Sequence, residues 1–161
     1  MARKKSWREK LRGNPELPSI KELYDESAPS KLKGWMVVPS PMEVYEIMQK
    51  VPDGRLITAQ EIRRILARRH GADFACPMTT GIFIGIAAQA AEEALRENES
   101  CAAPYWRTLK SGGLLNEKYP GGVEEQRRRL EAEGHRVERR GKHWAVVDYG
   151  ESLMDEDHFA L

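Results

Sequence analysis

The stretch "TAQEIRRILARRHGADFACPMTTGIFIGIAAQAA", residues 58–91, predicts two helices joined by a compact turn. Thr58 and Glu61 have the spacing of a capping box, so the first helix is expected to begin here. Gly71 is a natural end for it, because glycine adopts the left-handed backbone of a helix C-terminus at low cost. The second helix is expected to begin near residue 79 or 80 and to end near 97. Such a pair suggests a helix-turn-helix motif, which alone is weak evidence because many helical proteins contain similar pairs.

Segments on either side of this pair predict the rest of an α+β domain. Ser40-Pro41-Met42-Glu43 has a second capping box, with proline in the first helical position. Residues 122–133 are expected to form another helix, closed by Gly134. Beyond it, apolar and charged residues alternate on both sides of Arg140-Gly141-Lys142, which is typical of a β-hairpin. The expected fold is a mainly helical α+β domain, a winged helix-turn-helix with a C-terminal β-hairpin. A generic α+β domain that ends in a hairpin is the alternative.

Composition divides the chain into three parts. Residues 1–39 form an extension punctuated by prolines, residues 40–149 form the winged helix domain, and residues 150–161 form an acidic tail. In the extension we expect a short helix over residues 19–25, an extended piece over 35–38 and a disordered basic start.

Length and composition exclude several classes of protein. The chain has 161 residues, of which 40% are hydrophobic and 32% charged, as in ordinary globular proteins. No apolar run approaches the roughly 20 residues that a membrane-spanning helix needs, so we expect no membrane partner. No apolar signal segment follows the basic start, and Cys76 and Cys101 do not suggest a disulfide framework, so a cytoplasmic protein is expected. The four histidines lack metal-ligand spacing, and we expect no metal and no other cofactor.

The net charge of +1 hides local basic patches. Residues 55–69 contain five arginines against Glu61 as the one acidic residue. A surface of this kind attracts polyanions such as DNA, although a merely solvated helix face has the same composition. If the motif binds double-stranded DNA, the residues expected to face it are Arg55, Thr58, Arg63, Arg64, Thr79 and Thr80.

The segment "PYWRTLKSGGLLNEKYPGGVEEQRRRLEAEG", residues 104–134, carries the most specific pattern in the chain. It resembles the DNA-binding domain of the alkylguanine-DNA alkyltransferases and of the related alkyltransferase-like proteins. The resemblance covers about residues 41–137. The residues that fit the family pattern, in order and spacing, are Pro104, Arg107, Gly112, Gly113, Tyr119, Gly121, Gly122, Glu133 and Gly134.

The resemblance implies a specific chemistry. Members of the family bind the DNA minor groove, rotate an O6-alkylated guanine out of the stack, and transfer its alkyl group to a cysteine. Here Tyr105 stands in place of that cysteine, and Trp106 replaces the histidine that relays its proton. A neutral phenol, with an ordinary pKa of about 10, is a poor alkyl acceptor at neutral pH. Alkyltransferase-like proteins also lack the cysteine, and they bind the lesion and pass it to excision repair.

Two further departures from the family concern its DNA contacts. Ala59 stands where the family has a tyrosine that pushes on a phosphate, and residues 79–90 lack the arginine that fills the gap left by the extruded base. Ile82 or Phe83 could act as an apolar wedge instead, as in architectural minor-groove proteins. We expect both to belong to the core.

The sequence therefore predicts a non-catalytic DNA-binding protein that recognises O6-alkylguanine for repair, with DNA and a repair protein as partners. The expected lesion pocket consists of Tyr105, Trp106, Arg107, Asn116, Tyr119 and Gly121. Glu133, which orients the histidine in the family, is expected to bond the Trp106 indole or Arg107. One alternative is an alkyl-accepting enzyme that uses Cys76, which lies at the start of a helix, where a thiol is more readily ionised. Another is a protein-interaction adaptor that has lost DNA binding.

Overall fold

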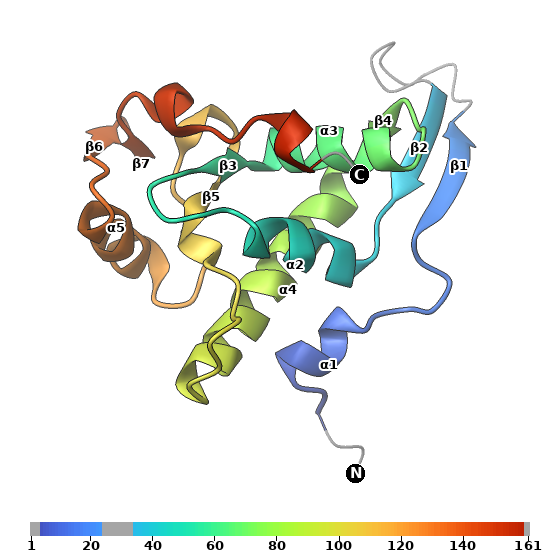
Figure 1. The fold of residues 1–161 in the computed structure, drawn as a ribbon, viewed down its shortest axis with the longest axis horizontal. Coiled ribbons are helices and arrows are strands. Elements are labelled where there is room, and N and C mark those ends of the chain that lie inside the picture. The colour runs from blue at the N-terminus through green and yellow to red at the C-terminus, as the bar shows by residue number, and fades with distance from the viewer. Residues whose placement is uncertain (1–3, 24–33, 160–161) are drawn as a thin grey trace.

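The computed structural model describes residues 4–23 and 34–159, and Figure 1 shows how their helices and strands are arranged. The helices are α1 (Trp7–Leu11), α2 (Pro41–Gln49), α3 (Ala59–Arg69), α4 (Pro77–Arg96) and α5 (Gly122–Ala132). The strands are β1 (Ser19–Leu23), β2 (Gly34–Val38), β3 (Ile57–Thr58), β4 (Phe74–Ala75), β5 (Thr108–Leu109), β6 (Val137–Arg140) and β7 (His143–Val146). Short 3-10 helices are η2 (Tyr105–Arg107), η3 (Ser111–Gly113), η4 (Tyr149–Ser152) and η5 (Glu156–Phe159). The expected α+β class with a C-terminal hairpin is confirmed.

The core forms where α2, α3 and α4 meet. Helix α4 runs through the middle of the molecule, with the β1–β2 pair on one side and α5 and the β6–β7 hairpin on the other (Figure 1). The side of α4 that faces the core is built largely from alanines, which let neighbouring helices approach closely. The side chains that α2 and α3 bury against it are Val44, Ile47, Met48, Ile62, Ile65 and Leu66, the apolar faces that helical spacing predicts.

Both predicted capping boxes are present. In α2, the Glu43 backbone N–H donates to the Ser40 hydroxyl oxygen at 3.2 Å, and the Ser40 N–H donates to the Glu43 carboxylate at 3.0 Å. At α3, the Thr58 N–H donates to the Glu61 carboxylate at 3.0 Å. These bonds satisfy backbone donors that the first turn of a helix leaves unpaired. The start of α4 differs from the prediction: it begins at Pro77, two to three residues earlier than expected.

Ser40→Ala is expected to lower the free energy of unfolding by about 1 kcal/mol, because it removes an N-cap acceptor. Chemical denaturation followed by circular dichroism would measure the change. Ser111→Ala, at an exposed serine outside any cap, is the matched control and should change stability by less than about 0.5 kcal/mol. Equal losses in the two variants would contradict this role for Ser40.

The N-terminal extension is better ordered than predicted. Helix α1 packs beside α4, where the backbone N–H groups of Trp7 and Arg8 donate to the Glu93 carboxylate at 2.9 and 3.3 Å. Leu11 is buried in the core. The prediction of a disordered basic start is therefore wrong for residues 7–11, because acidic groups on α4 neutralise the start of the helix and Leu11 anchors its end. Residues 1–3 lie outside the described residues.

The predicted helix over residues 19–25 is also wrong, because residues 19–23 form strand β1. This strand pairs antiparallel with β2, which confirms the extended piece expected over 35–38. Strand β2 in turn pairs parallel with β4, in the turn between α3 and α4. Backbone pairing with a neighbour that is distant in sequence thus overrides the local helix preference. Residues 24 and 25 lie outside the described part of the chain.

The C-terminal end combines the predicted hairpin with a segment that packs on the core. Strands β6 and β7 pair antiparallel. The Leu56 N–H then donates to the Ser152 carbonyl at 2.9 Å, and the Met154 N–H donates to the Leu56 carbonyl at 2.8 Å. The side chains of Met154 and Phe159 are buried in the core cluster. The acidic residues of this end therefore lie on a segment that is attached to the domain. None of the helices in the described residues is both long and apolar enough to cross a bilayer.

Candidate functional site

The short helix η2 holds the residues at the centre of the candidate pocket. It is followed at once by β5, which pairs parallel with β3, so that Leu109 lies opposite Thr58. Because β3 leads directly into α3, this pairing fixes η2 beside the start of the helix-turn-helix. Backbone pairing thus joins the pocket loop to the start of α3.

Tyr105 is fully buried. Its hydroxyl donates to the Glu92 carboxylate at 3.1 Å and lies 3.5 Å from the Pro120 carbonyl oxygen. Its ring makes edge contacts with the rings of Trp106 and Tyr119, each at 5.4 Å between centroids. Burial, and then the charge of Glu92, raise the pKa of the Tyr105 phenol above its ordinary value. The phenol is therefore neutral and acts as a hydrogen-bond donor.

The predicted pocket residues on the 116–121 loop have structural partners. The Tyr119 hydroxyl donates to the Thr108 carbonyl at 2.8 Å, and the ring is buried against Tyr105. The Asn116 N–H donates to the buried Gln126 side chain at 2.8 Å. Gly121 has a positive φ of 80°, which favours glycine at the start of α5. The Tyr105 ring thus packs between the rings of Trp106 and Tyr119, and the cluster leaves no room for a ligand at its centre.

An open hollow of about 540 Å³ lies outside this aromatic cluster. Glu92, which holds the Tyr105 hydroxyl, forms part of its wall, and Pro120 and Gly121 form another part. Charged side chains from α4 and α5 complete the lining, namely Arg96, Glu124, Glu125 and Arg128. The hollow therefore offers both acidic and basic groups beside the buried phenol.

Glu133 joins the two residues that follow Tyr105. The Trp106 indole N–H donates to its carboxylate at 2.7 Å, and Arg107 Nε donates at 2.8 Å. A further Arg107 nitrogen, Nη1, donates to the Val51 carbonyl at 2.7 Å. Burial by itself raises the pKa of Glu133, but hydrogen bonds from Arg107 and Trp106 outweigh it, so the pKa lies below its ordinary value. The sequence prediction named Trp106 or Arg107 as the partner of Glu133, and the structure shows both.

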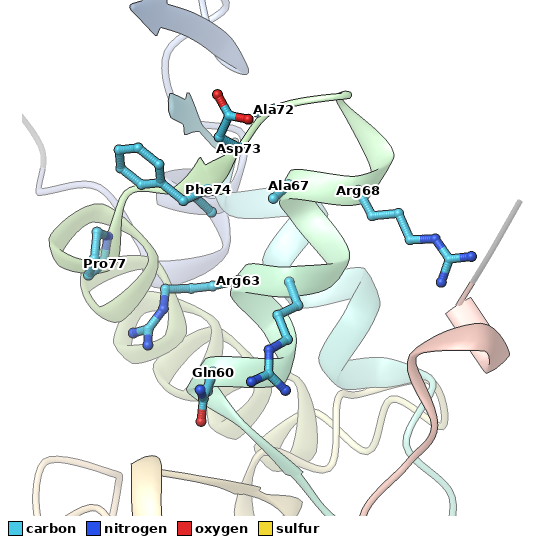
Figure 2. A pocket seen from close by; sticks show the side chains of 10 residues that line it. Gln60, Arg63, Ala67, Arg68, Ala72, Asp73, Phe74 and Pro77 are labelled. Atoms are coloured by element: carbon cyan, nitrogen blue, oxygen red, sulfur yellow. The ribbon is translucent and has the colours of Figure 1, made fainter. Parts of the chain in front are cut away.

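A second hollow, of about 750 Å³, lies on the outer side of the helix-turn-helix. Figure 2 shows Arg63 reaching along it toward Pro77, and Arg68 pointing away on the other side. Arg68 forms an ion pair with Asp157 at 2.8 Å, whereas Arg63 forms no hydrogen bond or ion pair within the described residues. The lining residues are Gln60, Arg63, Arg64, Ala67, Arg68, Ala72, Asp73, Phe74, Ala75 and Pro77.

Comparison with known proteins identifies the family. Residues 39–135 match the model for the DNA binding domain of 6-O-methylguanine DNA methyltransferase. The chain belongs to this family. Two solved structures from S. pombe are similar: Atl1 in complex with damaged DNA containing O6-carboxymethylguanine, with a TM-score of 0.49, and ATL in complex with DNA, with a TM-score of 0.48. Each is 22% identical, over 71% of this chain and 94% of its own. No curated protein sequence gives a significant match.

Cys76, the alternative nucleophile, lies far from the pocket around Tyr105. Cys76 is the residue before the first turn of α4, and its sulfur accepts a hydrogen bond from the Thr79 hydroxyl at 3.1 Å. Glu92 lies 16 residues further along the same helix. A helix rises 1.5 Å per residue, so these positions are about 24 Å apart. A base held beside Tyr105 cannot reach the Cys76 thiol without leaving the pocket.

The residues predicted to face DNA lie in different environments. Arg63 and Arg64 line the second hollow, which is called the basic hollow because Arg63, Arg64 and Arg68 line it. Thr58 and Thr80 are buried, and Thr79 is bonded to Cys76. The Arg55 guanidinium donates to the Leu153 carbonyl at 2.7 Å. Of the predicted set, the two arginines of α3 are therefore the residues that line this hollow.

Sequence reasoning missed two exposed apolar residues of α4. The prediction that Ile82 belongs to the core is wrong, since its side chain is 56% exposed, and Met78 is 76% exposed. Phe83 is partly buried and packs against the core, as expected. The helical period could have predicted this exposure. The buried residues Ile84, Ala87, Ala88 and Ala91 define the core face of α4, and Met78 and Ile82 lie on the opposite side of the helix.

Proposed function

We propose that this chain is a non-catalytic DNA-binding member of the 6-O-methylguanine DNA methyltransferase family that recognises O6-alkylguanine. The observation that carries the proposal is the buried, neutral Tyr105 at the position of the family's acceptor cysteine. An alkyl group is transferred by attack of an electron-rich atom, which a thiolate supplies and a protonated phenol does not. The Tyr105 hydroxyl also donates a hydrogen bond to the Glu92 carboxylate, and the rings of Trp106 and Tyr119 packed on Tyr105 leave no space there for an incoming alkyl group.

The DNA-binding part of the proposal rests on the basic hollow. Arg63 has no partner within the described residues, so its charge is available to a phosphate, and Arg64 lines the same hollow. Guanidinium groups bind phosphate oxygens through paired hydrogen bonds, which fix the position of a duplex without reading its sequence. Gln60 and Pro77 place this hollow beside the first turns of α3 and α4, the ends that a helix-turn-helix can direct at DNA.

The lesion-recognition part rests on the hollow beside Tyr105. An extruded O6-alkylguanine keeps its exocyclic amino group, which can donate to the Glu92 carboxylate. Pro120 and Gly121 present an uncharged wall against which a flat base can pack. The hydroxyl of the buried Tyr105 is bonded to Glu92 in the wall of this hollow, so the base is expected to stay outside the aromatic cluster. An alkylated base pairs weakly, which lowers the cost of its extrusion.

Fluorescence anisotropy with two duplexes, identical except for one O6-methylguanine, tests the proposal. Arg63→Ala is expected to weaken binding to both duplexes about tenfold and to reduce the slope of affinity against salt by about 1, since one phosphate contact is lost. Arg12→Ala removes the same charge at an exposed site after α1 and is the matched control. It should leave affinity nearly unchanged.

The same experiment separates the other functions. Tighter binding to the alkylated duplex, with no gain in protein mass after incubation, supports a non-catalytic lesion sensor. Equal binding to both duplexes contradicts lesion recognition and leaves a general DNA-binding protein. A mass gain at Cys76 would contradict the non-catalytic assignment. Failure to bind either duplex at low salt would favour an adaptor that has lost DNA binding.

A further inference from the structure

The segment that follows the β6–β7 hairpin lies against α3, the helix whose arginines line the basic hollow. It is anchored at two points: the Met154 N–H donates to the Leu56 carbonyl at 2.8 Å, and the Phe159 side chain is buried in the core cluster. Between these anchors lies the acidic run Asp155-Glu156-Asp157. The short helix η5, which includes the end of this run, packs against α3 (Figure 1). The fold thus holds acidic residues beside a helix that has an excess of arginine.

This C-terminal segment engages two arginines of the basic stretch over residues 55–69. The Asp157 carboxylate forms an ion pair with Arg68 at 2.8 Å. The Arg55 guanidinium donates to the Leu153 carbonyl at 2.7 Å. In Figure 2, Arg68 accordingly points away from the hollow, whereas Arg63 reaches along it. Two positive charges of the helix-turn-helix region are therefore directed at the C-terminal segment of the same chain.

Arg68 belongs to the side of α3 that forms the basic hollow. It is four residues after Arg64, so the two arginines lie one turn apart on one side of the helix. Both are among the residues that line the hollow. An arginine side chain changes direction by rotation about its own bonds, without a change in the backbone. Arg68 is therefore the side chain that the loss of the Asp157 carboxylate would add to the surface proposed to bind phosphates.

The ion pair is exposed enough to open while the fold stays intact. The side chains of Arg68 and Asp157 are 59% and 73% exposed. An exposed pair of this kind shifts an equilibrium by about twofold to fivefold. Because the anchors at Met154 and Phe159 keep Asp157 nearby, its carboxylate competes with a phosphate as an intramolecular group, at an effective concentration that dilution does not lower. The contact therefore opposes phosphate binding moderately and reversibly.

We propose that the C-terminal segment, residues 153–157, makes an autoinhibitory contact in which Asp157 holds Arg68 away from DNA phosphates. This inference rests on the proposed DNA binding and adds its regulation. The segment lies outside residues 39–135, which match the family model, so the contact is a feature of this chain beyond the matched domain. Phosphate contacts carry no sequence information, so the contact lowers the affinity for every duplex alike. Its consequence is shorter retention on undamaged DNA, which greatly outnumbers lesions.

The test measures binding of the full-length protein to an unmodified duplex by fluorescence anisotropy, between about 50 and 200 mM salt. Asp157→Asn leaves both anchors in place and is expected to tighten binding about twofold to fivefold at the lowest salt. The slope of log affinity against log salt should steepen by about 1, because Arg68 gains a phosphate, so the advantage should fade as salt is raised.

Glu97→Gln is the matched control. It makes the same change in net charge and removes a carboxylate that pairs with Arg8 at 2.5 Å. Glu97 is 20 residues after Pro77, so it lies about 30 Å along α4 from the basic hollow. Its replacement should leave the affinity nearly unchanged. Equal gains in Glu97→Gln and Asp157→Asn would reduce the effect to net charge and overturn the contact.

A double-mutant cycle with Arg68→Ala tests whether Asp157 acts through Arg68. Arg68→Ala alone should weaken binding much less than Arg63→Ala, because Arg68 is already held by the C-terminal segment. In the Arg68→Ala background, Asp157→Asn should no longer tighten binding, and a gain as large as in the wild type would overturn the inference. Equal affinities of the wild-type and Asp157→Asn proteins would also overturn it while leaving DNA binding intact. No binding by either protein would overturn the proposed function and the autoinhibitory contact together.

Discussion

Replacing Glu133 by alanine is expected to lower the free energy of unfolding by about 3–5 kcal/mol, because the change leaves a mostly buried arginine charge without its partner. The side chains of Glu133 and Arg107 are only 10% and 14% exposed, so water cannot replace the lost carboxylate. The Trp106 indole N–H loses its acceptor in the same change. Urea denaturation at pH 7 would measure the loss.

A matched control is available two residues earlier, within α5. Glu131 forms an ion pair with Arg127, but the two side chains are 45% and 35% exposed. Glu131→Ala should therefore cost less than about 1 kcal/mol, as is usual for surface pairs. Similar losses of stability in Glu131→Ala and Glu133→Ala would contradict the role of Glu133 in holding Trp106 and Arg107 of η2.

The stabilisation by Glu133 should also depend on pH. Its pKa in the folded state lies below the value of 4.5 that applies in the unfolded chain. The unfolded state therefore binds the proton more readily, and this contribution is complete above pH 4.5 and is lost as the pH falls through the folded pKa. The difference in stability between wild type and Glu133→Gln should shrink as the pH is lowered from 6 toward the folded pKa. A constant difference would contradict this linkage.

The second large effect is expected at Tyr105, where alanine should cost about 3–5 kcal/mol, since it removes a fully buried ring and leaves a cavity. Tyr105→Phe keeps the ring and loses only the bond to Glu92, so its cost should be about 1 kcal/mol. Thermal and chemical denaturation of the two variants would give the values. If alanine and phenylalanine cost the same, the buried ring of Tyr105 does not stabilise the fold through its packing.

Local signals in the sequence predicted much of this fold. The capping boxes at Ser40 and Thr58 were identified correctly because side chain and backbone interact within four residues. The hairpin was identified by its alternation around Gly141. Strand β1 was missed because its structure depends on pairing with β2, and its own residues carry no clear strand signal. Helix α1 was missed although Ser6 and Glu9 form the same kind of capping box, and the groups that anchor the helix to the domain lie on α4, far along the chain.

The candidate site was predicted in part. The family resemblance led to the prediction that Glu133 bonds Trp106 or Arg107, and both hydrogen bonds are present. The sequence could not show that Tyr105 and Tyr119 fill the space between them, because this depends on how two loops pack. Nor could it show which of Thr79 and Thr80 is accessible, since one residue of rotation on a helix separates a surface position from a buried one.

Residues at both ends of the described chain, outside the region that matches the family model, contribute to the hydrophobic core. The family pattern ends before the hairpin and begins after β1 and β2. Yet several core side chains come from outside it, namely Leu11, Val37, Val137, Ala145, Val146, Met154 and Phe159. The region that matches the family model and the stretch that supplies the hydrophobic core are therefore not the same part of the chain. The described ends outside the match are packed into the hydrophobic core, so shortening the chain to the matched residues would expose apolar surface on the domain itself.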